Sequence, residues 1–125
     1  MNRASLKRPL LALVAIAGLS AFAGCGKDSN PTTPPVTADV TIEIVANAGS
    51  SSYAPSPQVV AVGQTVSWHN ADGMTHTATA DGGAFGTGNI AAGATSAPIT
   101  MTVAGGFAYH CALHPSMVGT LTVNP

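Results

Sequence analysis

The sequence predicts an all-β protein, a Greek-key β-sandwich of about seven to eight strands. Three observations support this fold class. Short runs of residues alternate between apolar and polar side chains from residue 39 onward, beginning with residues 40–45. Turn-forming residues such as Asn70–Gly73 separate these runs at short intervals. No run between residues 39 and 125 has the apolar period of a helix, and strands at this spacing are typical of two packed sheets.

The expected elements follow one another along the chain. Residues 40–45 form the first strand. Residues 53–57 contain two prolines and are expected to be a loop or an irregular edge, because proline cannot donate to a β-ladder. Residues 81–94 are a glycine-rich excursion. Further strands are expected at residues 59–62, 65–68, 75–80, 96–103, 107–111 and 118–123.

The expected core consists of the apolar residues that these strands turn to one side. Side chains two residues apart share a face of a strand, so each strand contributes alternate positions. The candidates are Val40, Ile42, Ile44, Val60, Val62, Val66, Trp68, Phe107, Tyr109, Leu121 and Val123.

Residues 1–24 resemble the signal peptide of a bacterial lipoprotein. A positively charged start is followed by an apolar run, Leu10–Ala23, which is too short to span a bilayer comfortably. Residues 22–25 resemble a lipobox, in which Cys25 becomes the lipid-bearing first residue of the mature protein. Ordinary signal cleavage after Ala23 is the alternative. We favour the lipoprotein, an exported, periplasmic or cell-surface protein anchored to a bacterial membrane.

The rest of the chain divides into a linker and one domain. Residues 25–38 comprise Cys25 and a polar stretch rich in Pro and Thr, which is typical of an extended tether. Residues 39–125 form the domain, which has four acidic residues and no Lys or Arg. A surface without basic residues cannot bind phosphate backbones, so nucleic-acid binding is excluded. Docking through apolar contacts is expected instead.

Cys111 has no cysteine partner if Cys25 carries lipid. An unpaired thiol in an oxidising compartment is either buried and inert or protected by a metal. His114 and Met117 follow Cys111 at the spacing C-x2-H-x2-M. A thiolate, imidazoles and a thioether together favour copper among the common biological metals. A complete site of this kind needs one more histidine, and His76 is the candidate.

Two motifs in this chain resemble those of the cupredoxins, the blue copper proteins, and are closest to the plastocyanin, pseudoazurin and amicyanin group. The resemblance covers residues 39–124. The first motif has the form W-x-N-x-D-x-x-x-H, and the second has the form Y-x-C-x-x-H-P-x-M-x-G. The matching residues are Trp68, Asn70, Asp72 and His76 for the first, and Tyr109, Cys111, His114, Pro115, Met117 and Gly119 for the second.

This resemblance implies one type 1 copper ion, cycling between Cu(II) and Cu(I), with His76, Cys111, His114 and Met117 as its ligands. It also implies an electron-transfer protein rather than an enzyme. Electrons would pass through the exposed edge of His114 to a redox protein such as a cytochrome, an oxidase or a dehydrogenase. The expected docking patch around it consists of Met74, Phe85, Ala112, Leu113 and Pro115. We expect a monomer tethered to the membrane by its lipid.

Two other functions remain open. The same ligands would serve a protein that stores or delivers copper. A fragment of a copper oxidoreductase is the second alternative, because in some copper enzymes a histidine beside the type 1 cysteine binds a second copper. Here that residue is His110, but only His69 is left to join it, and such sites need at least three histidines. His110 is expected to be a partly exposed strand histidine, and His69 is expected to occupy an exposed polar position.

Overall fold

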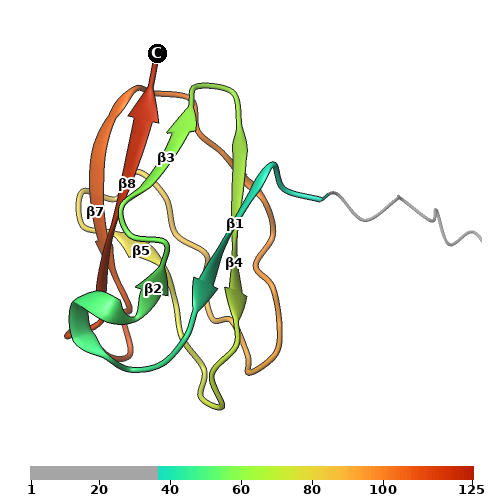
Figure 1. The fold of residues 1–125 in the computed structure, drawn as a ribbon, viewed down its shortest axis with the longest axis vertical. Coiled ribbons are helices and arrows are strands. Elements are labelled where there is room, and N and C mark those ends of the chain that lie inside the picture. The colour runs from blue at the N-terminus through green and yellow to red at the C-terminus, as the bar shows by residue number, and fades with distance from the viewer. Residues whose placement is uncertain (1–36) are drawn as a thin grey trace, which may run out of the picture. The chain divides into compact units, whose positions relative to one another are not determined.

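A computed structural model describes residues 37–125 of the protein (Figure 1). The predicted signal peptide (residues 1–24), the proposed lipid attachment at Cys25 and the linker up to residue 36 lie outside the described residues. They therefore stay predictions. Between residues 37 and 125, no helix has the length and apolar character needed to cross a bilayer.

The described residues form two four-stranded sheets, which confirms the all-β sandwich. One sheet has the order β2-β1-β4-β6 and the other has the order β3-β8-β7-β5. A single turn of 3-10 helix, η1 (Gly49–Ser51), precedes β2. The strands are β1 (Val40–Ile44), β2 (Tyr53–Ala54), β3 (Gln58–Ala61), β4 (Thr65–Asn70), β5 (Thr79–Ala80), β6 (Ile99–Thr100), β7 (Gly105–His110) and β8 (Val118–Asn124).

Both sheets are built from strands that are distant in the chain. β1 pairs with β4 in parallel, and β3 pairs with β8 in parallel. Parallel neighbours need long connections, so the chain crosses from one sheet to the other between them. The last pair, β7 and β8, is antiparallel and aligns Tyr109 with Gly119. In Figure 1 β8 rises towards the C-terminus, so the connection between β7 and β8 lies at the opposite end of the sandwich.

The core lies between the two sheets and follows the alternation expected from the sequence. In β8, Gly119, Leu121 and Val123 are buried, while the residues between them are exposed or half-buried. Trp68 is fully buried and stacks on Phe85, with ring centroids 5.3 Å apart. Eight of the core candidates are buried: Ile42, Ile44, Val60, Val66, Trp68, Tyr109, Leu121 and Val123. Val40 and Phe107 are half-buried and pack against them.

Three expectations about the strands are wrong in detail. Val62 is exposed, because β3 ends at Ala61 and the chain then turns. The strand expected at residues 75–80 shrinks to Thr79–Ala80, and the strand expected at residues 96–103 shrinks to Ile99–Thr100. Before β5, isolated bridges of His76 with Ile90 and of Thr79 with Gly86, in the glycine-rich segment, take the place of a continuous ladder.

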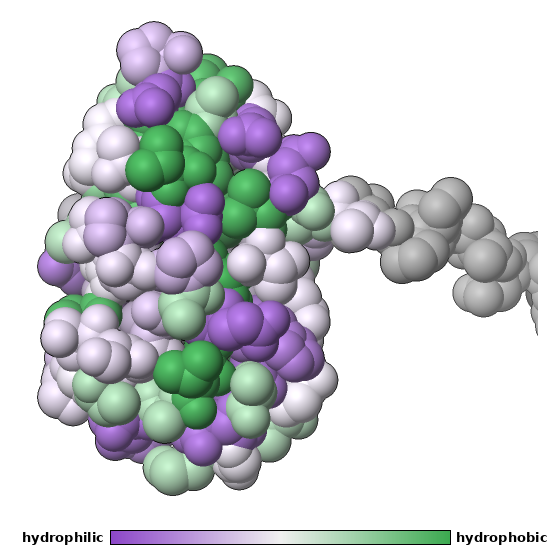
Figure 2. All heavy atoms as spheres, in the orientation of Figure 1, coloured by the Kyte–Doolittle hydropathy of each residue, from purple (hydrophilic) through white to green (hydrophobic). Residues whose placement is uncertain are grey.

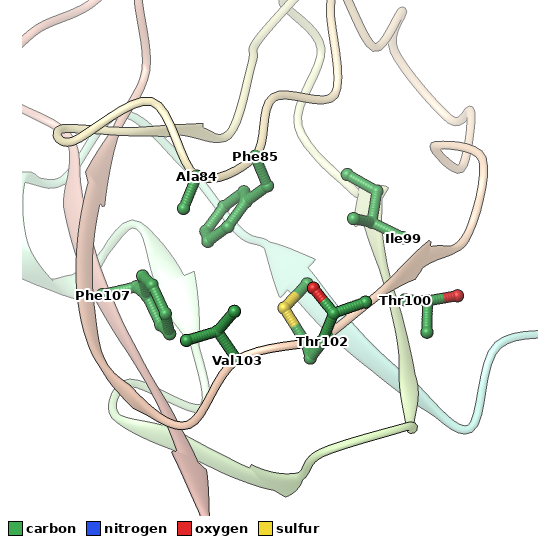
Figure 3. A pocket seen from close by; sticks show the side chains of 8 residues that line it. Ala84, Phe85, Ile99, Thr100, Thr102, Val103 and Phe107 are labelled. Atoms are coloured by element: carbon green, nitrogen blue, oxygen red, sulfur yellow. The ribbon is translucent and has the colours of Figure 1, made fainter.

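The edge of the sandwich near β6 opens into an apolar cavity of about 280 Å³. Figure 3 shows the rings of Phe85 and Phe107 and the side chain of Val103 facing this space. Its walls come from the segments around β6 and the first half of β7. The metal-ligating candidates do not line this cavity.

Gly119 allows a close approach that any larger residue would prevent. A Cβ atom built on Gly119 would lie 2.6 Å from the hydroxyl oxygen of Tyr109 and closer still to the ring carbon Cζ. The ring of Tyr109 therefore lies directly over the backbone of its cross-strand partner. Position 119 therefore requires glycine because of the Tyr109 ring. Tyr109 is a core residue and lies two residues before Cys111.

Candidate metal centre

Three side chains converge beneath the loop that joins β7 to β8. The sulfur of Cys111 lies 3.8 Å from Nδ1 of His76 and 3.8 Å from Nδ1 of His114. One ligand atom from each residue lies within 4.8 Å of the other two. Cys111 and His76 are fully buried, while His114 is half-buried. Within residues 37–125 this is the single such cluster of His, Cys, Asp or Glu side chains.

The loop that follows β7 is held in a compact form by its own backbone. Cys111 N–H donates to the carbonyl of Met117 at 3.0 Å, and Met117 N–H donates to the carbonyl of His114 at 2.9 Å. His114 N–H donates to the carbonyl of Cys111 at 3.2 Å. These bonds hold Cys111, His114 and Met117 together in one tight loop. Met117 is fully buried, which suits a weak thioether ligand in a dry site.

His76 reaches the site from the loop between β4 and β5. The side-chain amide of Asn70, at the end of β4, donates to the carbonyls of Met74 and Ile90 at 2.6 and 2.9 Å. His76 and Ile90 exchange two backbone hydrogen bonds, 3.1 and 2.8 Å long. Asn70 therefore ties together the two segments that hold the histidine in place. This explains the asparagine of the first motif.

The tautomer of His76 follows from its partner. Nε2 of His76 lies 2.7 Å from a carboxylate oxygen of Asp72, and an ionised carboxylate can only accept a hydrogen bond. Nε2 therefore carries a proton, and Nδ1 is the nitrogen that faces the Cys111 sulfur and that would bind a metal in its unprotonated form. A metal ligand whose second ring nitrogen is bound to a carboxylate is a common arrangement, because it fixes the ring and makes it more basic.

Hydrogen bonds also lower the pKa of the Cys111 thiol. Burial by itself raises the pKa of the thiol. The backbone N–H of Thr77, 3.3 Å from the sulfur, and the imidazoles of His114 and His76 lower it more strongly, and the net pKa is about 6. Cys111 is therefore mainly a thiolate at neutral pH, which is the form that binds metals. For His76, burial lowers the pKa, but the bonds to Asp72 and Cys111 outweigh it and the net pKa is raised.

Comparison with solved structures agrees with the geometry. No family model matches the chain, and no curated protein matches it. A purple cupredoxin from Nitrosopumilus maritimus is 28% identical with a TM-score of 0.58, over 69% of this chain and all of that one. An oxidised variant of amicyanin is 26% identical with a TM-score of 0.59, over 68% of this chain and 81% of that one. The domain has the cupredoxin fold.

The cupredoxin fold also occurs within a larger enzyme. A copper-containing nitrite reductase from Thermus scotoductus SA-01 is 27% identical with a TM-score of 0.60. The match covers 69% of this chain but only 22% of the reductase chain. The similarity therefore extends to one part of that enzyme. In this cupredoxin domain, the donor set of His76, Cys111 and His114, with Met117 buried in the same loop, fits one type 1 copper ion.

The other two histidines of the cupredoxin domain lie away from this cluster. Nδ1 of His110 lies 2.6 Å from the carboxylate of Asp81, on the face of β7 opposite Cys111. Nδ1 of His69 lies 2.9 Å from the hydroxyl of Thr95. Both side chains are about one-third exposed, which confirms the expectation for His110, whereas His69 is more buried than expected.

Four of the five residues predicted to form a docking patch are exposed. Ala112, Leu113 and Pro115 are exposed in the ligand loop, and Met74 is exposed in the loop after β4. The structure does not place Phe85 in this patch. Its ring is 8% exposed, packs on Trp68 and faces the cavity near β6, so it cannot contribute exposed surface here. The other four candidates are loop residues, and their role in docking stays a prediction.

Two further residues contribute to the site. Thr77 donates its N–H to the Cys111 sulfur, and its hydroxyl oxygen accepts the N–H of Ala112 at 2.8 Å. The hydroxyl of Tyr53 donates to the carbonyl of Thr77 at 2.6 Å. Thr77 directly follows the candidate ligand His76, and the sequence alone leaves its hydrogen bond to the cysteine loop undecided, whereas the structure shows that bond. Tyr53 lies in a segment that the sequence marked only as a loop or irregular edge, far from both motifs.

Proposed function

We propose that this protein is an exported one-electron carrier that holds one type 1 copper ion through His76, Cys111, His114 and Met117. The observation that supports the proposal is the convergence of three side chains: the buried thiolate of Cys111, the buried imidazole of His76 and the half-exposed imidazole of His114. When bound, copper supplies the one-electron couple. The protein contributes a fixed ligand set and excludes water from the thiolate.

The arrangement suits electron transfer because the ligands are held before the metal arrives. His76 is held by Asp72 on one side and by the backbone pairing with Ile90 on the other. The ligand loop is closed by hydrogen bonds between Cys111, His114 and Met117. A site that is already organised reorganises little when the ion changes its oxidation state, and fast exchange of electrons requires this.

The route for the electron is proposed to pass through His114 to a redox protein. Leu113 and Met74 are 50% and 49% exposed beside it. On the face drawn in Figure 2, apolar areas are small and are separated by polar ones. A small apolar contact favours a weak and short-lived complex, at the low end of interface sizes. The partner is proposed to be a cytochrome, an oxidase or a dehydrogenase, and the carrier is proposed to act as a monomer.

Addition of Cu(II) to the purified protein tests this function. We expect an intense visible absorption band from thiolate-to-copper charge transfer, with one copper per chain and reversible one-electron reduction. Cys111→Ser should abolish the band, whereas Cys25→Ser, which changes the other cysteine, should retain it. Absence of colour in the unmodified protein, or colour in the Cys111→Ser variant, would show that the assignment is wrong.

Export and lipid attachment at Cys25 form a separate part of the proposal. They rest on the sequence of residues 1–25 alone. Mass spectrometry of the mature protein tests them. A chain that starts at a lipid-modified Cys25 supports the tether, whereas an unmodified chain that starts at Gly24 rules it out.

A catalytic role is the second candidate, because one similar structure is a copper-containing nitrite reductase. A second copper centre would need further histidines. His110 is the one beside Cys111, and it is paired with Asp81 on the opposite face of β7. We therefore favour the carrier, and a measured ratio of two copper ions per chain would favour the enzyme.

Storage or delivery of copper would use the same ligands as a carrier. The burial of Cys111, His76 and Met117 favours retention of the ion over rapid transfer to another protein. Measurement of electron exchange and copper release separates these functions. A carrier exchanges electrons in much less time than it takes to release copper, and the reverse order would favour delivery.

A further inference from the structure

We propose that Tyr53 is a positioning residue for the redox centre. Its hydroxyl holds Thr77 so that the Thr77 amide donates to the Cys111 sulfur, and this contact raises the reduction potential. The inference rests on the proposed function, because it concerns the copper thiolate. It adds a residue from outside both sequence motifs, on a strand that carries no ligand.

The backbone N–H and C=O of Thr77 are not paired with a neighbouring strand. On one side, its neighbours His76 and Ala78 are bonded to the segment that returns along them, through Ile90 and Thr87. The N–H and C=O of Thr77 point to the other side. No strand pairs with Thr77 there, because β5 begins only at Thr79.

Side chains take the place of the missing strand. The Thr77 N–H donates to the Cys111 sulfur at 3.3 Å, and the Thr77 carbonyl accepts the Tyr53 hydroxyl at 2.6 Å. Tyr53 belongs to β2 in one sheet, whereas Cys111 follows β7 in the other. Tyr53 therefore links the far sheet to the residue that contacts the metal-binding thiolate.

Because Thr77 is buried, water cannot replace the Tyr53 hydroxyl as the donor to its carbonyl. Tyr53 and Thr77 are 2% and 4% exposed, and Cys111 is fully buried. A buried carbonyl that loses its donor is left without the bond that offsets its desolvation, so the segment would shift to reach another donor. The Thr77 hydroxyl is already committed to Ala112 and Thr79. A shift of the backbone at Thr77 would lengthen its contact with the sulfur.

Hydrogen bonds to a metal-bound thiolate act on the redox couple. An N–H donor draws negative charge from the sulfur, which stabilises the reduced ion relative to the oxidised one. The pKa of Tyr53 is raised, first by burial and then by the nearby Cys111 thiolate, so the phenol stays protonated and remains a donor. Loss of its hydroxyl should weaken the Thr77 contact and lower the potential.

Tyr109 provides a matched control in the same cluster. Its ring lies edge-on to that of Tyr53, with centroids 4.8 Å apart, and it is 1% exposed. Its hydroxyl has no hydrogen-bond partner. Tyr53→Phe and Tyr109→Phe thus remove the same atom from neighbouring buried rings, but only the first removes a bond to Thr77.

The experiment compares the copper-loaded full-length protein with these two variants. Tyr53→Phe should lower the ratio of reduced to oxidised protein at a given applied potential about threefold, which is about 28 mV for a one-electron couple. Its thiolate-to-copper band should shift as well. Tyr109→Phe should leave both unchanged. In the Cu(I) proteins, NMR should show faster exchange of the Thr77 amide proton only in Tyr53→Phe.

The outcomes separate this inference from the proposed function. An unmodified protein that shows no blue band contradicts the function itself. If it is blue and Tyr53→Phe keeps its potential, Tyr53 is merely structural and the inference is wrong, even if the variant melts earlier. Equal shifts in both variants overturn it as well.

Labelling covers the case in which Tyr53→Phe does not fold. The chain has only two tyrosines, so Tyr109→Phe grown on 3-fluorotyrosine carries fluorine at Tyr53 alone. A fluorinated phenol is a stronger donor and should raise the potential. An unchanged potential would overturn the inference.

Discussion

The carboxylate of Asp72 lies 2.7 Å from Nε2 of His76, four residues later in the chain. This pair turns the other ring nitrogen of His76 towards the Cys111 sulfur, 3.8 Å away. A second pair, Asp81 and His110, has a similar separation of 2.6 Å but contributes no ligand to the cluster. The effect of the Asp72 carboxylate on metal binding can therefore be compared with that of the Asp81 carboxylate, which lies outside the cluster.

Asp72→Ala should weaken copper binding by about tenfold or more, because the ring of His76 loses the partner that orients it. Competition with a chelator of known affinity measures this loss. Asp81→Ala is the control and should leave the affinity unchanged. A similar loss of affinity in both variants would show that the loss comes from removing any negative charge from the domain and does not come from the orientation of His76.

Gly119→Ala should destabilise the folded protein by about 1–3 kcal/mol, because a new Cβ would collide with the ring of Tyr109. That ring cannot easily move aside, since Trp68 and Tyr53 pack against it. Chemical denaturation measures the change. Gly106→Ala, in the facing strand β7, is the control: its Cβ would meet nothing within 4 Å, so little change is expected. Equal losses would contradict the proposed collision.

Asp39 should make the stability of the domain depend on pH in acid. Its carboxylate accepts the backbone N–H and the hydroxyl of Thr65, both at 2.8 Å, and these bonds lower its pKa below the ordinary 3.8. A lowered pKa means stabilisation that is complete above the ordinary pKa and is lost as the pH falls through the lower, folded value. Asp39→Ala should therefore melt earlier than the unmodified protein at pH 6, and the difference should disappear towards pH 2.

The matched control for this pH dependence is Glu43→Ala, on the same strand β1. Glu43 has a single long contact, 4.0 Å to His69. We expect its melting temperature to follow that of the unmodified protein down the same acid range. A difference between Asp39→Ala and the unmodified protein that persists unchanged at pH 2 would contradict the assignment of the effect to the Asp39 carboxylate.

Removal of copper should lower the melting temperature. The ligands His76 and Cys111 are 35 residues apart in sequence and meet only in the folded chain, so the ion binds the folded state in preference to the unfolded one. A free concentration one hundred times the dissociation constant corresponds to about 2.7 kcal/mol of stabilisation. Calorimetry with and without a chelator measures it. Cys111→Ser should show no copper-dependent change, and a change in that variant would indicate binding elsewhere.

The fold class and much of the core could be predicted because they depend on local alternation. Ile42, Ile44, Leu121 and Val123 repeat with period two, and this repetition is visible without any knowledge of strand partners. Val62 belongs to the same apolar run as Val60, but it follows the end of β3 and is exposed. Alternation indicates which residues share a face, whereas the end of a strand depends on the neighbouring strand.

The parts of the site that could be predicted are those whose residues lie close together in the sequence. Cys111, His114 and Met117 are spaced for one loop, and His76 came from the resemblance of its own motif. Tyr53 could not be predicted, because its contact with Thr77 depends on how β2 of one sheet meets the loop before β5 of the other. Phe85 was misplaced for the same reason, since its burial depends on the fold of the glycine-rich segment.

The position of β8 has a consequence for the order in which the domain assembles. This strand lies between β3 and β7, and Met117 directly precedes it. Until β8 has paired, β3 and β7 have no common neighbour and the loop that carries Cys111, His114 and Met117 is held at one end only. The candidate metal centre is therefore completed in the same step that closes the second sheet.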